Sequence, residues 1–219
     1  MLIKPILDTA KRVALQKLTD YATENMSHGP AALSVIEPEI SQLAVSVFEY
    51  QARFEEDQKV LQEDLITSAD FTRYCIRAIP LSEVEGIDEL LSVLKEIGAV
   101  SADIEARAIA RARSQFEINR RKADEWRVSL ERAERNNDYD RMIRNITSRL
   151  RGFEREMLRY ETNMRAIDLR GDRIEMLLAD IIGRLVEMKR QLLQRRGEFV
   201  AFARECEAWK MNRIEEGIY

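Results

Sequence analysis

The sequence has few residues that interrupt a helix. Of 219 residues only 8 are glycine and 4 are proline, and all the prolines (Pro5, Pro30, Pro38 and Pro80) lie in the first 80 positions. Because proline removes a backbone donor and clashes with the preceding turn, only this first part contains residues that oppose a helix strongly. Charged residues make up 34% and hydrophobic residues 45%. This balance is typical of long helices rather than of a sheet protein.

Long apolar runs are also missing. No stretch approaches the ~18–20 apolar residues that span a bilayer. The first 18 residues mix charged with apolar side chains and lack the continuous apolar core of a secretory signal. Two cysteines, Cys75 and Cys206, do not make a disulfide framework, and each is expected to pack as a small apolar residue. We therefore expect a cytoplasmic protein, with any membrane contact peripheral.

Residue types that carry chemistry are scarce. The single histidine, His28, precedes Gly29 and Pro30 in a turn signal, where a solvated side chain is expected. The spacings of zinc sites, phosphate-binding loops and dinucleotide-binding turns do not occur. A di-iron bundle needs Glu-x-x-His motifs that one histidine cannot supply. The sequence predicts no catalytic residue, no metal site and no cofactor, and so a protein that is not an enzyme.

Apolar residues at helical spacing predict four helices, at 3–26, 34–78, 82–135 and 139–215. Ser34 and Ser82 are expected N-caps, because each is followed three residues later by a glutamate as in a capping box. Gly86 and Gly98 are points where the third helix can bend. The short connection at 136–138 predicts that the third and fourth helices form an antiparallel hairpin.

The fourth helix carries a 3.5-residue apolar repeat. Alternating steps of four and three residues from Ile146 to Trp209 meet apolar side chains everywhere except at Gly171 and Arg195. The seam traced along the third helix has two exceptions, Glu105 and Asn119. A repeat kept this long specifies a left-handed coiled-coil seam. At ~1.5 Å per residue the fourth helix would be roughly 115 Å long, so we expect an elongated molecule.

A second apolar stripe joins the first after Gly171 and passes through Leu177, Ile182, Val186, Leu193 and Val200. A broad stripe is buried from more sides than a narrow one. A second copy is the economical way to cover it, so we expect a homodimer. The residues predicted for the core and dimer interface are Leu177, Leu178, Ile181, Ile182, Leu185, Val186, Leu192, Phe199 and Trp209.

Charge is unevenly distributed along the chain. Residues 1–100 hold 9 Lys and Arg against 17 Asp and Glu, whereas residues 101–215 hold 26 against 21. The basic residues on the two arms of the expected hairpin are either ordinary ion-paired surface residues or a surface for polyanions. The residues predicted to bind an anionic membrane are Arg107, Arg111, Arg113, Arg120, Arg121, Lys122, Arg141, Arg144, Arg149 and Arg151. Aromatic residues do not interleave with them and the net charge is -4, so nucleic acid is not an expected partner.

This layout resembles the BAR domain superfamily, most closely its sorting-nexin and arfaptin branches. The resemblance covers the three helices at 34–78, 82–135 and 139–215, with ALSVIEPEISQL beginning the first and FVAFARECEAW near the end of the third. It implies a crescent-shaped antiparallel dimer of three long kinked helices, with residues 136–138 at the tip and the broad stripe at the dimer centre. The segment 3–26 is similar to the amphipathic wedge that some BAR proteins insert into lipid; packing on its own bundle is the other interpretation.

The expected organisation is an N-terminal amphipathic helix and turn at 1–30 and an all-α, BAR-like coiled-coil domain at 31–219. The expected function is a dimeric helical module that binds, senses or shapes anionic membranes. Two alternatives stay open: a soluble coiled-coil scaffold that binds proteins, for which the acidic first half is a candidate surface, and a polymerising helical membrane coat. A helical pore-forming toxin ranks last, because the sequence has no uninterrupted apolar hairpin.

Overall fold

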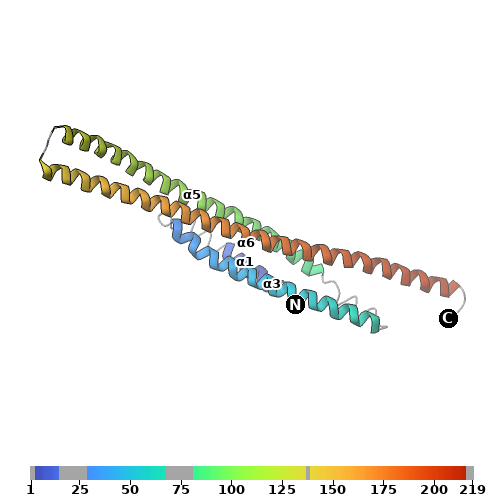
Figure 1. Cartoon of the computed structure of the whole chain (residues 1–219). Coiled ribbons are helices and arrows are strands. Elements are labelled where there is room, and N and C mark those ends of the chain that lie inside the picture. The colour runs from blue at the N-terminus through green and yellow to red at the C-terminus, as the bar shows by residue number, and fades with distance from the viewer. Residues whose placement is uncertain (1–2, 15–28, 68–80, 137–138, 216–219) are drawn as a thin grey trace. The chain divides into compact units, whose positions relative to one another are not determined.

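The protein is all-α in the part that the structure describes. The computed structural model describes residues 3–14, 29–67, 81–136 and 139–215. These ranges contain no strand and hold the helices α1 (Lys4–Arg12), α3 (Gly29–Thr67), α5 (Leu81–Arg135) and α6 (Asp140–Glu215) (Figure 1). The expected fold class, all-α, is confirmed at this level.

The helix starts differ from those predicted. Helix α3 begins at Gly29, so Ser34 lies inside the helix and the prediction that it is the N-cap is wrong. The physical reason is that Leu33 is fully buried, and the helix extends upstream to place it in the core. Helix α5 begins at Leu81, which puts Ser82 within the first turn rather than at the cap. The expected helical ends at 15–26 and 68–78 lie outside the described residues.

Two compact units divide the chain between them. Unit 1 comprises residues 1–15, 40–96 and 177–219, and unit 2 comprises residues 16–39 and 97–176. The helices α3, α5 and α6 each contribute residues to both units. In α3 the division follows Pro38, a proline inside the helix that removes one backbone hydrogen bond of the ladder.

Unit 1 buries apolar side chains from all four helices. On α3 and α5 the buried positions recur at alternating steps of three and four residues, which is the repeat of helices that pack along each other. The fully buried side chains include Leu43 and Val47 of α3, Leu90 and Leu94 of α5, and Ile181 and Leu185 of α6. Arg184 of α6 lies over the ring of Phe48, 4.3 Å from its centroid, and donates to Gln51 Oε1 at 3.0 Å. These polar contacts lie at the edge of an apolar core.

Helix α1 is held in unit 1 by a buried carboxylate. Glu83 of α5 is 5% exposed and accepts hydrogen bonds from the Tyr50 hydroxyl and, at 3.2 Å, from the backbone N–H of Ile3. The second bond places a negative charge at the N-terminal end of α1, where the helix dipole favours it. Gly86 lies one turn along α5, and a Cβ there would overlap Cγ2 of Ile3. Gly86 is therefore a packing position, in a helix α5 that continues without interruption.

The apolar face of α1 is buried within the same unit. Ile6, Leu7 and Ala10 of α1 are buried, as is Val13 just beyond it, and Lys11 forms an ion pair with Glu89 of α5. These contacts match the interpretation in which the N-terminal segment packs on its own bundle. Helix α1 ends at Arg12, and the part of the predicted helix from residue 15 to residue 26 lies outside the described residues.

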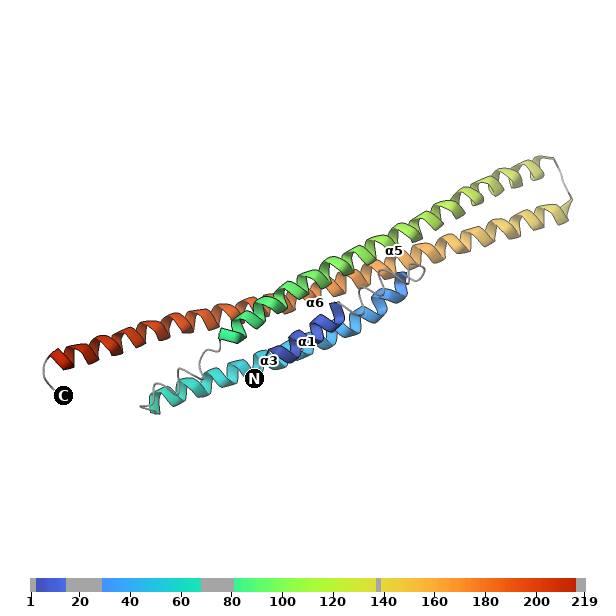
Figure 2. The ribbon, with the colours of Figure 1, turned by 180° about the vertical axis from the view of Figure 1, so that it is seen from behind.

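In unit 2, residues 97–135 of α5 and 140–176 of α6 form an antiparallel pair, called here the hairpin (Figures 1 and 2). Its register follows from three contacts in which one residue number rises as the other falls. Gly171 adjoins Glu105, the Phe153 ring adjoins Lys122, and the Trp126 ring adjoins Arg149. The connection holds only residues 136–139, as the predicted antiparallel hairpin requires.

The apolar seam predicted along α6 is confirmed where side chains are described. Each of its positions from Ile146 to Leu192 is buried or half-buried. Glu105 and Gly171, which each interrupt the apolar seam of their helix, lie next to each other. The Glu105 carboxylate occupies the space that a side chain at position 171 would fill. A glycine in α6 thus makes room for a charged side chain from α5.

Candidate anion-binding surface of the hairpin

The outer part of the hairpin is basic. Residues 106–160 contain 15 Lys and Arg against 9 Asp and Glu. All ten residues predicted to bind an anionic membrane lie in this stretch, and all ten side chains are exposed. They are spread over both helices and do not converge on one point. A surface of this kind can attract an extended polyanion, and its attraction is screened by salt.

Some of these ten basic residues form ion pairs with neighbouring carboxylates. Arg107 pairs with Asp103 at 2.5 Å and Arg120 pairs with Glu117 at 3.3 Å. By contrast, Arg113, Arg121 and Arg151 form no ion pair with any residue that the structure describes. Exposed pairs contribute only a few tenths of a kcal/mol, but they lower the positive charge that a ligand meets. The unpaired arginines therefore supply most of the available charge.

Two of the residues predicted to bind an anionic membrane lie over aromatic rings. The Lys122 ammonium lies 5.8 Å from the centroid of the Phe153 ring, and the Arg149 guanidinium lies 5.0 Å from the centroid of the Trp126 ring. A cation over the face of an aromatic ring is attracted by the ring quadrupole and keeps its full charge. These contacts cross between α5 and α6, so the two cations also stabilise the hairpin.

One face of α6 carries a row of arginines beside an open surface pocket of about 770 Å³. Its lining residues come from one helix and are Arg144, Thr147, Ser148, Arg151, Glu154, Arg155 and Leu158. Glu154 binds Arg127 of α5 at 3.0 Å and raises the pKa of that guanidinium. Leu158 is 64% exposed, so the row of arginines is continued by an apolar side chain.

The side chain of Glu105 lies at the base of the hairpin in an acidic environment. Partial burial raises the pKa of the Glu105 carboxyl, and the charges of Asp168, Asp172 and Glu175 raise it further. Nearby, Glu37 of α3 meets Arg173 at 3.5 Å and Arg170 at 3.9 Å. The described residues include no group of three or more His, Cys, Asp or Glu side chains able to hold a metal ion.

In unit 1, the residues predicted for the core and dimer interface fall into two sets. Leu178, Ile181, Leu185 and Leu192 are buried in the core of the chain itself. Leu177 and Ile182 are half-buried, and Val186 is 51% exposed. The side chains of Phe199 and Trp209 lie outside the described residues. Within this set, the side chains available to a partner are those of the second stripe.

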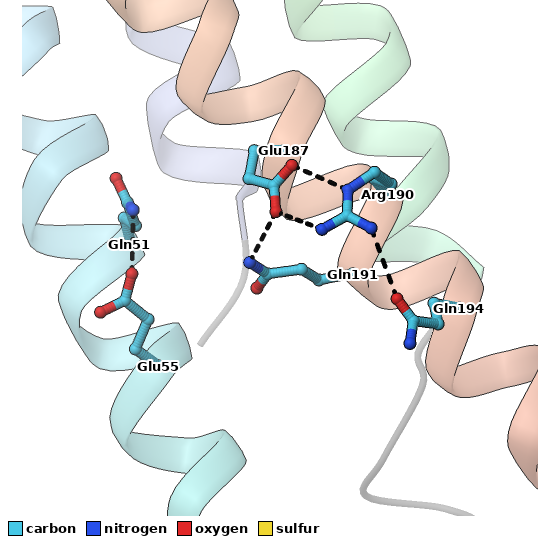
Figure 3. Close-up of polar contacts among 6 residues, drawn as sticks. All are labelled: Gln51, Glu55, Glu187, Arg190, Gln191 and Gln194. Atoms are coloured by element: carbon cyan, nitrogen blue, oxygen red, sulfur yellow. Dashed lines mark hydrogen bonds and ion pairs between the residues drawn. The ribbon is translucent and has the colours of Figure 1, made fainter.

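A polar network lies next to the second stripe on α6. Arg190 donates to both carboxylate oxygens of Glu187, at 2.7 and 2.8 Å, and Gln191 donates to the same carboxylate at 3.0 Å (Figure 3). These bonds, the one from Arg190 above all, lower the pKa of the Glu187 carboxyl to about 2. Figure 3 also shows Arg190 reaching Gln194, one turn further on. The network fixes side chains along an exposed helix.

Sequence reasoning missed the part that the aromatic residues play. Trp126 lies on the apolar seam of the third predicted helix and Phe153 on that of the fourth; both rings are half-buried and each also lies beneath a cation. The sequence did contain one indication of these contacts. A basic residue precedes each aromatic residue by four positions, Lys122 before Trp126 and Arg149 before Phe153, which places the two on the same side of a helix. That spacing fits many arrangements, and only the pairing of two helices selects one.

Within the ranges that the structure describes, no helix holds an apolar stretch of the length and hydropathy needed to cross a membrane. Compared with protein-family models, with curated proteins and with solved structures, the chain matches none of them. The protein is all-α, with long helices paired along apolar seams.

Proposed function

We propose that the protein is a dimeric, BAR-like helical module that binds anionic membrane surfaces through the basic residues of the hairpin. The observation that carries this proposal is the excess of exposed basic over acidic side chains along residues 106–160. Lys and Arg near an anionic bilayer each contribute about 1 kcal/mol of attraction. Several such residues acting together give reversible, peripheral binding, which needs no membrane-spanning helix.

Dimerisation through the second stripe is the other half of the proposal. Val186 and Leu193 are 51% and 45% exposed on α6, although each belongs to an apolar stripe at helical spacing. Covering such side chains with a second copy removes them from water and doubles the number of hairpins that a membrane meets. Two weak basic surfaces on one particle bind more tightly than one, because the second contact is intramolecular.

The test is co-sedimentation with liposomes. Vesicles that contain phosphatidylserine should retain the protein at low salt and release it at high salt, and neutral vesicles should not retain it. Reversing three unpaired charges of the hairpin should abolish binding; the variant is Arg113→Glu, Arg121→Glu and Arg151→Glu. Absence of wild-type binding at every salt concentration would refute the membrane role.

A matched control separates local from overall charge. Arg12, Lys95 and Arg196 are exposed in unit 1, and none of them has an ion pair with a described residue. Reversing these three charges changes the net charge of the protein by the same amount as the hairpin variant. If both variants lose binding equally, the attraction comes from net charge and the hairpin has no special part in it.

A soluble scaffold is the second candidate, and the ion pairs favour it. Several hairpin arginines already have carboxylate partners one turn away, among them Arg107, Arg135 and Arg165. On this alternative the exposed apolar side chains bind a protein, and liposomes bind nothing. Light scattering then measures the oligomeric state. A dimer that becomes a monomer in Val186→Glu supports the proposed interface. Val128→Glu on the hairpin is the control and should leave the dimer intact.

A further inference from the structure

A second pocket on the hairpin has the features of an individual binding site. It is an open surface pocket of about 580 Å³ to which both helices contribute. Asn119 comes from α5, and the remaining lining residues come from α6: Arg149, Gly152, Phe153, Arg155 and Glu156. The seam of α5 is interrupted by Asn119 at this place, so a polar side chain lies where the repeat calls for an apolar one.

Three cations lie at or beside the pocket, Lys122, Arg149 and Arg155, and none of them forms an ion pair with a residue that the structure describes. Arg149 is stacked on Trp126, and Lys122 is stacked on Phe153, whose ring lines the pocket. Arg155 donates from Nε to the Arg151 carbonyl at 3.3 Å, which leaves its terminal nitrogens for other acceptors. One carboxylate also lines the pocket, that of Glu156, and it lies 3.6 Å from Arg159.

Space for a ligand comes from Gly152. A Cβ at this position would meet no atom within 4 Å, so the surface is hollow where every other residue type would place a side chain. The Asn119 amide donates one hydrogen to the Gln115 carbonyl at 2.9 Å and has a second hydrogen to donate. A glycine hollow lined by two guanidinium groups and an amide donor suits a small, doubly charged oxyanion.

We propose that this pocket binds a phosphomonoester group, held by Arg149 and Arg155 with the Asn119 amide as an additional donor. Such a group carries about two negative charges at neutral pH and several strong acceptor oxygens, which guanidinium groups bind in bidentate fashion. The inference rests on the proposed function for the source of the group, a phosphorylated lipid headgroup. A soluble phosphate ester offers the same chemistry without a membrane.

The experiment compares vesicles of equal charge. One set contains phosphatidylinositol 4-phosphate, and the other contains enough phosphatidylserine to match its surface charge. Wild-type protein should bind the phosphoinositide vesicles at least tenfold more tightly, and the soluble headgroup, inositol 1,4-bisphosphate, should compete. Equal binding to the two sets overturns the pocket while leaving the proposed membrane function intact.

Gly152→Glu tests the pocket without disturbing the helix. The new side chain has free space and places a carboxylate among the phosphate-binding groups, so binding should fall to the phosphatidylserine level. Gly197→Glu is the matched control, since a Cβ at that glycine of α6 also meets nothing within 4 Å. Equal effects of the two substitutions overturn the proposal. Arg149→Met, which keeps an apolar side chain over Trp126, should cause the same loss as Gly152→Glu.

Failure of the two proposals can be told apart. If no vesicle binds but inositol 1,4-bisphosphate does, in a manner lost in Gly152→Glu, the pocket is a site for a soluble phosphate ester and the membrane function is wrong. If neither vesicles nor the soluble headgroup bind, both proposals fall. Thermal melts of each variant followed by circular dichroism establish that the helices are intact in every comparison.

Discussion

Unit 1 and the hairpin of unit 2 use the same kind of helix in different surroundings. In unit 1 four helices contribute to one core, and side chains such as Leu90, Ile181 and Leu185 are fully buried. In the outer part of the hairpin, residues 106–160, the seam is narrower: among its described side chains only the small ones of Ala123 and Ala133 are that well buried, while Trp126 and Phe153 are half-buried. The number of neighbouring helices thus sets how much each apolar residue contributes to stability.

The comparison extends to polar residues in core positions of α5. In unit 1 the buried Glu83 accepts two hydrogen bonds, and in unit 2 the hydroxyl of the buried Ser101 has no hydrogen-bond partner among the residues that the structure describes. Both occupy the repeat that apolar residues fill elsewhere on the same helix. Glu83 fixes the start of α1, whereas Ser101 fixes nothing, so the two sites should respond to substitution in opposite directions.

Truncation of the core should give the largest difference. Leu185→Ala, at a fully buried position in unit 1, is expected to lower the free energy of unfolding by about 3–5 kcal/mol. Leu150→Ala in the hairpin, where the side chain is 9% exposed, should lower it by about 2–3 kcal/mol. Urea denaturation followed by circular dichroism measures both. Equal costs would show that the hairpin is as well covered as unit 1.

Buried polar groups provide the second test. Glu83→Ala removes the carboxylate that accepts from the Tyr50 hydroxyl and from the Ile3 amide, which should cost about 2–3 kcal/mol. Ser101→Ala removes an unsatisfied hydroxyl and introduces the best helix former, so it should raise stability by about 1 kcal/mol. The same denaturation assay applies. A loss of stability in Ser101→Ala would mean that its hydroxyl has a partner in solution.

Substitution of two glycines tests whether the side chain packed against each one can move aside. Gly86→Ala forces a methyl group against the branched side chain of Ile3 and should cost about 1–3 kcal/mol, with faster hydrogen exchange in α1. In Gly171→Ala the atoms nearest to the new methyl group belong to the end of the flexible Glu105 side chain, which can move toward water. Its cost should be offset by the ~1 kcal/mol gain in helix propensity. When Glu105 is also replaced by alanine, Gly171→Ala should raise the stability of the protein. If it does not, a side chain other than Glu105 also needs the space at position 171.

The smallest effects concern pH, and the two regions should differ in sign. The pKa of Glu105 in the hairpin is raised above 4.5 on folding. Its ionised form therefore destabilises the folded state at neutral pH, and this penalty fades as pH falls through the folded pKa. The pKa of Glu187 in unit 1 is lowered to about 2, so its stabilising contribution is present above 4.5 and is lost between 4.5 and about 2.

The measurement is Tm against pH for Glu105→Gln and Glu187→Gln beside the wild type. At neutral pH the first substitution should raise Tm and the second should lower it. The Glu105→Gln difference should vanish by about pH 4, and the Glu187→Gln difference only toward pH 2. Shifts of the same sign would contradict the environments assigned to these carboxylates.

The sequence by itself determined the helices and their inward faces. The 3.5-residue repeat from Ile146 to Leu192, the scarcity of glycine and proline, and the short connection after Arg135 are local features, and each predicted what the structure has. Helix starts were less predictable. Ser34 has the right neighbours for a cap, but burial of Leu33 outweighs it, because packing contributes more than one capping bond.

Only the tertiary structure decided which residues that interrupt the apolar repeats contact one another across helices. That Glu105 lies against Gly171, that Glu83 receives the amide of Ile3, and that Arg149 stacks on Trp126 depend on the register between helices. The same holds for the arginines of the hairpin, whose charge is available or neutralised according to the rotamer and the neighbouring helix. Periodicity is written within a few turns of one helix, whereas register is set by the summed fit of long seams, and no single segment contains that information.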